Sequence, residues 1–150
     1  MRALIQRVAN ASVEIDNQVY GHIDYGLLIF LGVEEADDQK DAEWLVRKIT
    51  QMRILNDKSG VMNESVLDQN QGILVISQFT LHASTKKGNR PSYIRAARPE
   101  TAESLYKHFI LKLTELLDQK VQSGVFGANM QVKFTNDGPV TILLDTKNPE

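Results

Sequence analysis

The run from Gly72 to Leu81, Gly-Ile-Leu-Val-Ile-Ser-Gln-Phe-Thr-Leu, limits the possible folds of this chain more than any other stretch. Its four consecutive apolar residues, Ile73–Ile76, predict a strand that is buried on both faces. Polar side chains follow at Ser77, Gln78 and Thr80, and in a regular strand the last two would share one face. Each buried polar group left unpaired costs about 1–3 kcal/mol. The strand end is therefore either an exit to solvent or a site whose polar groups face a substrate.

Composition indicates an ordinary globular protein and limits its chemistry. The 150 residues suit one domain spanning 1–150, and 42% hydrophobic with 24% charged residues can form a core. A net charge of −2 predicts no general attraction to nucleic acid or anionic membrane, so such binding would need a local patch. The absence of cysteine excludes disulfides, a thiolate nucleophile and cysteine-bound zinc.

Neither the first residues nor the interior of the sequence indicates a membrane or secretory role. The opening Met-Arg-Ala-Leu-Ile-Gln-Arg lacks the long apolar region of a signal peptide. No apolar run approaches the ~20 residues that cross a bilayer. We therefore expect a cytoplasmic protein that has no membrane partner.

Periodicity predicts a mixed α/β domain. Two amphipathic helices are expected, one after Asp37-Asp38 and one from Pro99 to a point just before Gly124. Apolar runs or alternation predict further strands over 3–15 with a bend near Asn10, and over 19–23, 27–33, 126–135 and 140–144. The last two strands are separated by a predicted turn at Asn136–Pro139. We expect a curved, barrel-like, largely antiparallel sheet covered by two main helices.

Arg7 interrupts an apolar row. In the strand over 3–15, alternation places Arg7 on the same face as Ile5, Ala9 and Val13. A buried guanidinium needs acceptors for its five donors. Either the fold supplies these acceptors, or a bulge turns Arg7 outward.

The segment from Ser84 to Arg98 is a strongly basic loop. It contains no acidic residue, and Gly88, Asn89 and Pro91 favour an irregular backbone. It is either a solvated surface loop or a phosphate-contacting loop, with Tyr93 available to stack on a base. Its cations are Lys86, Lys87, Arg90, Arg95 and Arg98.

Several familiar site types are absent. The sequence has no Gly-x-x-x-x-Gly-Lys phosphate loop, no Gly-x-Gly-x-x-Gly, no His-Glu-x-x-His and no Gly-x-Ser-x-Gly elbow. Of the three scattered histidines, only His82 follows the polar strand end, and spacing alone does not predict a Ser-His-Asp triad. Gly138-Pro139 is by itself a turn signal, although only an X–Pro bond adopts the cis form cheaply.

Four short motifs together resemble the D-aminoacyl-tRNA deacylase family over essentially the whole chain. The order and spacing of the motifs carry the resemblance, because each motif alone is weak. The N-terminal Arg2–Val8 is also similar. The motifs are Ser77-Gln78-Phe79-Thr80-Leu81, Arg90-Pro91-Ser92, Phe126-Gly127-Ala128-Asn129-Met130, and Asn136-Asp137-Gly138-Pro139-Val140-Thr141.

The resemblance implies an enzyme of translation quality control. It would hydrolyse the ester between a D-amino acid and the 3′ end of tRNA, and it would also accept glycine, including glycine mischarged on tRNA-Ala. It implies a homodimer in which the strand-end motif of one subunit meets the Gly-Pro motif of the other. In the family that Gly-Pro bond is cis, and its carbonyls hold the α-amino group where an L-side chain would clash.

The resemblance also assigns the site residues. It implies that Arg7 fixes the orientation of the Gly-Pro motif, and it requires neither a metal nor a cofactor. The expected catalytic residues are Ser77, Gln78, Phe79 and Thr80; the expected substrate-binding residues are Gly138, Pro139, Val140, Arg7 and Met130; and the expected tRNA-binding residues are Lys86, Lys87 and Arg90.

Ester hydrolysis needs a positioned nucleophile and donors aimed at the developing oxyanion. The Phe79 and Thr80 amides and the Gln78 side chain are candidate donors. Thr80 is one candidate nucleophile, but nothing in the sequence supplies it with a base, and we favour assistance by the terminal 2′-hydroxyl of the tRNA. The alternatives to an enzyme are a non-catalytic RNA-binding module that uses the basic loop and a small structural dimer without a ligand.

Overall fold

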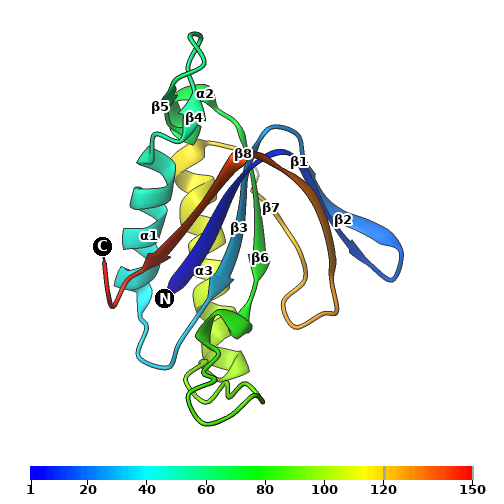
Figure 1. Cartoon of the computed structure of the whole chain (residues 1–150), viewed down its shortest axis with the longest axis vertical. Coiled ribbons are helices and arrows are strands. Elements are labelled where there is room, and N and C mark those ends of the chain that lie inside the picture. Colours follow the sequence, from blue (N-terminus) through cyan, green and yellow to red (C-terminus); the bar gives the residue numbers. More distant parts are fainter. Residues whose placement is uncertain (120, 150) are drawn as a thin grey trace.

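One strongly curved sheet organises the computed structural model, which describes residues 1–119 and 121–149 (Figure 1). The strand order is β2-β1-β3-β6-β7, and β8 pairs with the other edge of β1. The strands of this sheet are β1 (Arg2–Ile15), β2 (Gln18–Ile23), β3 (Gly26–Gly32), β6 (Gly72–Ser77), β7 (Gln122–Ser123) and β8 (Gln131–Asp145). A separate small hairpin consists of β4 (Leu55–Asn56) and β5 (Met62–Glu64).

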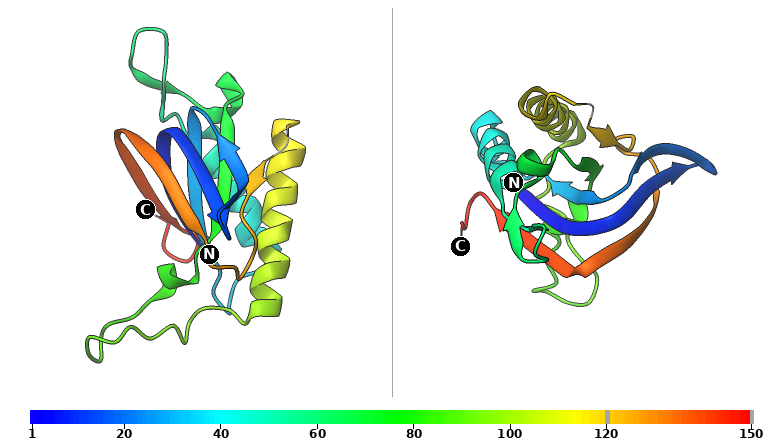
Figure 2. Two further views of the ribbon diagram at one scale, coloured as in Figure 1. Left: turned by 90° about the vertical axis from the view of Figure 1, so that its right-hand side faces the viewer. Right: turned by 90° about the horizontal axis from the view of Figure 1, so that it is seen from above.

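The sheet is mixed, with mostly antiparallel pairing. Strand β1 runs antiparallel to β2, β3 and β8, whereas β3–β6 and β6–β7 are parallel. The prediction of a curved, largely antiparallel sheet in a mixed α/β domain is confirmed. Seen from above in Figure 2, β1 and β8 bend together around one side of the molecule.

Strand β6 is buried on both faces, as its apolar run predicts. Ile73 and Val75 belong to the larger core beneath the helices. Leu74 and Ile76 point to the other face of β6 and belong to a second core, together with Leu28 of β3. All four apolar side chains of the run are at most 2% exposed.

Helices α1 (Gln39–Gln51) and α3 (Pro99–Leu117) cover the outer face of the sheet and pack against each other (Figure 1). Their apolar stripes point into the larger core, as predicted. Asp38 caps α1 by accepting from the amides of Lys40 and Asp41, and Pro99 begins α3. The described structure also contains the one-turn helix α2 (Val66–Gln69) and a 3-10 turn over Phe79–His82.

The predicted end of the second helix at Gly124 is wrong. Helix α3 ends at Leu117, and Asp118 takes the left-handed conformation there, with a φ of 50°. An aspartate tolerates this conformation at a helix end, so no glycine is needed. Gly124 instead follows β7.

Strand β1 bends where its partners change. Its pairing register with β8 shifts on both sides of Val8, close to the predicted bend at Asn10. The alternation is interrupted at this bend, where Val8 is buried and Ala9 is exposed, contrary to the predicted unbroken row, and the odd-numbered buried row resumes at Ala11. The part of β1 before the bend pairs with β3, and the part after it pairs with β2.

Two predicted strand boundaries near the motifs are also wrong. The strand expected over 126–135 begins only at Gln131, because Phe126–Ala128 form a turn in which Gly127 has a φ of 75°. The residues Asn136–Pro139 do not reverse the chain. They form an irregularity inside β8, and both halves of β8 pair with β1. No helix among the described residues is long and apolar enough to span a bilayer.

Candidate functional site

A pocket of about 670 Å³ opens where β6 ends, between the start of α3 and the segment that leads into β8. It brings together four of the predicted site residues, namely Ser77, Gln78, Phe79 and Met130. The remaining lining residues are mostly apolar: Leu31, Val33, Ile76, Tyr93, Ala96, Ala97, Arg98, Pro99, Ala102, Tyr106, Phe126, Gly127, Ala128 and Val132.

The polar strand end turns away from the sheet instead of continuing it. Strand β6 ends at Ser77, and Phe79–His82 form the 3-10 turn, so the face assignment of a regular strand does not apply to Gln78 and Thr80. The Gln78 amide donates to the Leu31 carbonyl at 2.8 Å, which ties the turn to β3. A side chain at Gly32 would lie 2.9 Å from the Gln78 carbonyl oxygen, so glycine permits this close approach.

The turn leaves donors at its start. Phe79 and Thr80 are its first residues, where N–H groups have no carbonyl of the same turn to pair with. The Gln78 side-chain amide donates to the Thr80 hydroxyl. Among the described residues, no His, Asp or Glu side chain hydrogen-bonds to that hydroxyl. The arrangement therefore supplies amide donors at the start of the turn, where Phe79 lines the pocket and Thr80 does not, and the described residues supply no base for Thr80.

His82 is the last residue of the same turn and does not line the pocket. Its side chain is fully buried, and within the described part of the chain both ring nitrogens lack hydrogen-bond partners. Burial lowers the pKa of His82, which favours the neutral imidazole. We assign it a packing role that anchors the end of the turn in the interior.

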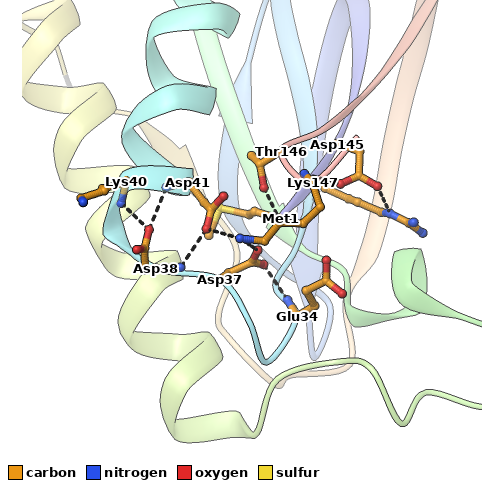
Figure 3. A network of polar contacts seen from close by, with 10 residues as sticks. Met1, Glu34, Asp37, Asp38, Lys40, Asp41, Asp145, Thr146 and Lys147 are labelled. Atoms are coloured by element: carbon orange, nitrogen blue, oxygen red, sulfur yellow. Dashed lines mark hydrogen bonds and ion pairs between the residues drawn. The ribbon is translucent and has the colours of Figure 1, made fainter. Parts of the chain in front are cut away.

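A network of polar contacts joins the N-terminal end of β1 to the C-terminal end of β8 and to the segment before α1 (Figure 3). Arg2 pairs with Asp145 through Nε at 2.8 Å and donates from Nη1 to the Leu81 carbonyl at 2.9 Å. The Met1 ammonium group pairs with the buried carboxylate of Asp37, which also accepts from the Glu34 amide at 2.7 Å. The bond from Arg2 to the Leu81 carbonyl attaches the 3-10 turn to β1, in addition to its attachment to β3.

Arg7 is buried, and the fold supplies its acceptors. The side chain is 6% exposed, and its Nη1 donates to the Ile54 carbonyl at 2.9 Å and to Asn56 Oδ1 at 3.0 Å. Its Nε contacts the Asp137 carboxylate at 2.9 Å and the Asp137 carbonyl at 3.3 Å. Of the two alternatives for Arg7, the buried one is therefore confirmed.

The Gly138–Pro139 segment is exposed and held from several sides. Its peptide bond is cis, and Gly138 has a φ of 124°. A side chain at Gly138 would lie 2.9 Å from Arg7 Nη2, so this position tolerates only glycine without rearrangement. Asn136 Nδ2 donates to the carbonyls of Arg7 and Val140, each at 3.0 Å, which closes the irregularity in β8.

Within one chain the predicted site residues form two separate groups. Arg7, Gly138, Pro139 and Val140 do not line the pocket. Figure 1 shows the middle of β8 toward one end of the molecule, whereas β6 runs toward the 3-10 turn at the other end. The fold therefore does not bring the Gly-Pro segment of the chain to the pocket of the same chain.

The basic loop projects from the body of the molecule (Figure 2). Lys86, Lys87 and Arg90, here called the loop cations, are all exposed. Reciprocal backbone bonds of 2.9 Å between Ser84 and Ser92 close the loop at its base. The chain then returns along the pocket wall at Ala96–Arg98.

Sequence reasoning missed part of the pocket wall. In the sequence, Tyr106 is only one residue on the apolar face of the helix expected from Pro99, yet it lines the pocket and its hydroxyl donates to the Val75 carbonyl at 2.9 Å. Burial raises the pKa of Tyr106 to about 12, so it stays a neutral donor. Among the residues that the structure describes, no group of three or more His, Cys, Asp or Glu side chains could hold a metal ion.

Comparisons with known proteins identify the family. The family model for D-Tyr-tRNA(Tyr) deacylase matches residues 4–145. Proteins named D-aminoacyl-tRNA deacylase from Bacteroides thetaiotaomicron and Chromobacterium violaceum are each 55% identical over 150 residues, which cover 100% of both chains.

Two solved structures share the fold. A c-Myc DNA unwinding element binding protein superposes with a TM-score of 0.91 at 40% identity, covering 97% of this chain and 98% of that one. A probable eukaryotic D-amino acid tRNA deacylase superposes with a TM-score of 0.84 at 14% identity, covering 95% and 97%, which indicates a shared fold alone. The family model and the full-length relatives confirm the resemblance seen in the motifs: the chain belongs to the D-Tyr-tRNA(Tyr) deacylase family and is an enzyme of this hydrolase family.

Proposed function

We propose that this protein hydrolyses the ester bond between a D-amino acid and the 3′ end of tRNA, and so releases both for reuse. The main support is the pocket at the end of β6, where an apolar wall meets the unpaired amides that open the 3-10 turn. The full-length relatives named D-aminoacyl-tRNA deacylase point to the same substrate. Because charged tRNA is made and used in the cytoplasm, the proposal includes a cytoplasmic location.

In the proposed reaction the protein positions and polarises the ester. The amides of Phe79 and Thr80, with the Gln78 side chain, donate to the oxyanion that develops on the ester carbonyl. Water attacks the carbonyl carbon with assistance from the 2′-hydroxyl of the terminal nucleotide. The bond to the 3′ oxygen then breaks, leaving a free carboxylate and a 3′-hydroxyl. The support for this route is that Thr80 accepts from Gln78 and has no base among the described residues.

The proposed active unit is a homodimer. The Gly138–Pro139 segment of one subunit would complete the pocket of the other, because within one chain the two do not meet. Exposed apolar side chains on β8 support an interface there, since Phe134 is 39% and Leu143 is 57% exposed. Covering such side chains with a partner surface removes apolar area from water and lowers the free energy.

The dimer explains chiral selection in this proposal. The backbone carbonyls of the Gly-Pro segment accept hydrogen bonds from the α-ammonium group of the substrate. The adjacent backbone leaves room for hydrogen but not for an L-side chain, so D-amino acids and glycine fit. Glycine mischarged on tRNA-Ala is therefore a second proposed substrate. Arg7 contributes by holding Asp137 and the neighbouring Gly138 in place.

Single-turnover deacylation tests the proposal. We expect D-tyrosyl-tRNA to be hydrolysed and L-tyrosyl-tRNA to be left intact, with glycyl-tRNA-Ala hydrolysed as well. Hydrolysis of both tyrosyl enantiomers at equal rates would contradict the selection mechanism. Tight tRNA binding without any hydrolysis would instead support a non-catalytic nucleic-acid-binding module, the alternative considered from the sequence.

A further inference from the structure

Two exposed aromatic rings lie at the edge of the pocket, and an exposed isoleucine follows one of them in the chain; these three residues are here called the patch. Phe79 and Tyr93 lie edge to face with ring centroids 5.0 Å apart, and they are 57% and 38% exposed. The next residue, Ile94, is 88% exposed. Both rings also line the pocket, so the patch lies between the pocket interior and solvent.

The backbone fixes this patch in place. Phe79 begins the 3-10 turn that is tied to β3. Tyr93 follows the Ser84–Ser92 bridge, and its carbonyl accepts from the Ala96 amide at 2.9 Å. Fixed aromatic rings provide contact area with little loss of conformational entropy on binding.

The positive charge of the basic loop next to the patch indicates which kind of partner the patch binds. No acidic residue occurs between Ser84 and Arg98, so the patch borders the loop cations without a competing negative charge on that loop. A cationic track beside exposed aromatic rings matches single-stranded nucleic acid, whose phosphates follow the cations while its bases stack. A double-stranded stem would satisfy the cations but would leave the rings without bases to contact.

We propose that Phe79, Tyr93 and Ile94 form a stacking surface for the unpaired nucleotides that precede the terminal nucleotide of tRNA. This rests on the proposed function, in which the 3′-terminal ester enters the pocket. The strand that carries the ester must then leave across the edge where this patch lies. The loop cations lie beyond the patch and contact the phosphates of the acceptor stem.

Measuring the affinity for tRNA with and without its unpaired 3′ nucleotides tests the proposal. The probes are uncharged tRNA with its complete 3′ end and the same tRNA without its unpaired 3′ nucleotides. Replacing one stacking ring by alanine removes about 5- to 150-fold in affinity per base. We expect Tyr93→Ala to weaken binding of complete tRNA by an amount in this range and to leave binding of the shortened tRNA unchanged. Tyr93→Phe should retain wild-type binding.

Two matched controls separate stacking from other effects. Tyr20→Ala removes a tyrosine that is 53% exposed on β2 and does not line the pocket, so it should change neither affinity. Lys86→Ala should weaken the binding of both probes. As a direct readout, 2-aminopurine at the penultimate position should lose fluorescence with the wild type and keep it with Tyr93→Ala.

Equal weakening of both probes by Tyr93→Ala, or no weakening of either, would overturn the stacking surface. A change in sedimentation behaviour of Tyr93→Ala or Ile94→Asp would overturn it too, by identifying the patch as a protein interface. The outcome is separable from the deacylase proposal. Preferential binding of complete tRNA by a wild-type protein that fails to hydrolyse D-tyrosyl-tRNA would refute that activity and retain the surface.

Discussion

Replacing Arg7 by methionine tests how the buried guanidinium stabilises the fold. Methionine keeps an unbranched apolar stem and deletes every donor of the arginine side chain. The change leaves the Ile54 carbonyl, Asn56 Oδ1 and the Asp137 carbonyl without their present partner. It also leaves the Asp137 carboxylate without its cation.

The expected loss follows from these contacts. Removing one partner of a buried ion pair costs about 3–5 kcal/mol, mostly because the remaining charge stays buried. The Asp137 side chain is 39% exposed, so water can partly replace the lost cation and the low end applies. We expect Arg7→Met to lower the free energy of unfolding by about 3 kcal/mol. For a domain of this size the midpoint temperature should fall by roughly 6–12 °C.

Urea unfolding at fixed protein concentration measures this loss, since oligomerisation would make the midpoint concentration-dependent. Lys107→Met is the matched control, because it breaks an ion pair with Glu103 in which the Lys107 side chain is 71% exposed, and it should cost only about 1 kcal/mol or less. A loss below 1 kcal/mol for Arg7→Met, with an unchanged urea dependence, would refute the reasoning. It would mean that the desolvation cost of the guanidinium cancels its hydrogen bonds.

Three further measurements test other parts of the structure. Alanine in place of all three loop cations should weaken tRNA binding and reduce the slope of log affinity against log salt by about 2–3, at about 0.7–0.9 per lost phosphate contact; an unchanged slope would remove the loop from the interface. Thr80→Ala should keep the rate of D-tyrosyl-tRNA deacylation within about tenfold of wild type, which corresponds to a change of about 1.4 kcal/mol in the activation barrier. An acyl-enzyme trapped on Thr80 would contradict the route through the 2′-hydroxyl. Burial alone would raise the pKa of Asp41, but hydrogen bonds led by the one from Lys147 lower it to about 2. This carboxylate therefore stabilises the fold above pH 4 and loses that effect as the pH falls through 2, so Asp41→Asn should be destabilising in neutral urea melts and nearly silent near pH 2.

The sequence alone determined the helices and strands that follow from the pattern of residues close together along the chain. The apolar run Ile73–Ile76 specifies a strand buried on both faces, because burying each of its side chains in a core is favourable. The stripe that begins at Ala42 and the stripe that begins at Ala102 specify helices, because a period near 3.6 places their apolar residues on one face. The four motifs were sufficient to identify the family.

Only the tertiary structure decided the features that depend on distant partners. Whether Arg7 is buried depends on acceptors near Ile54 and Asp137, which lie 47 and 130 residues away along the chain. Asn136–Pro139 has the composition of a turn, yet pairing with β1 on both sides makes it an irregularity inside one long strand. Strand β6 stops at Ser77 because, after the last bond to β3 from the Gln78 amide to the Leu31 carbonyl, the chain curls into the 3-10 turn. Local propensity cannot encode such contacts, since each is a hydrogen bond whose partner only the assembled sheet brings within reach.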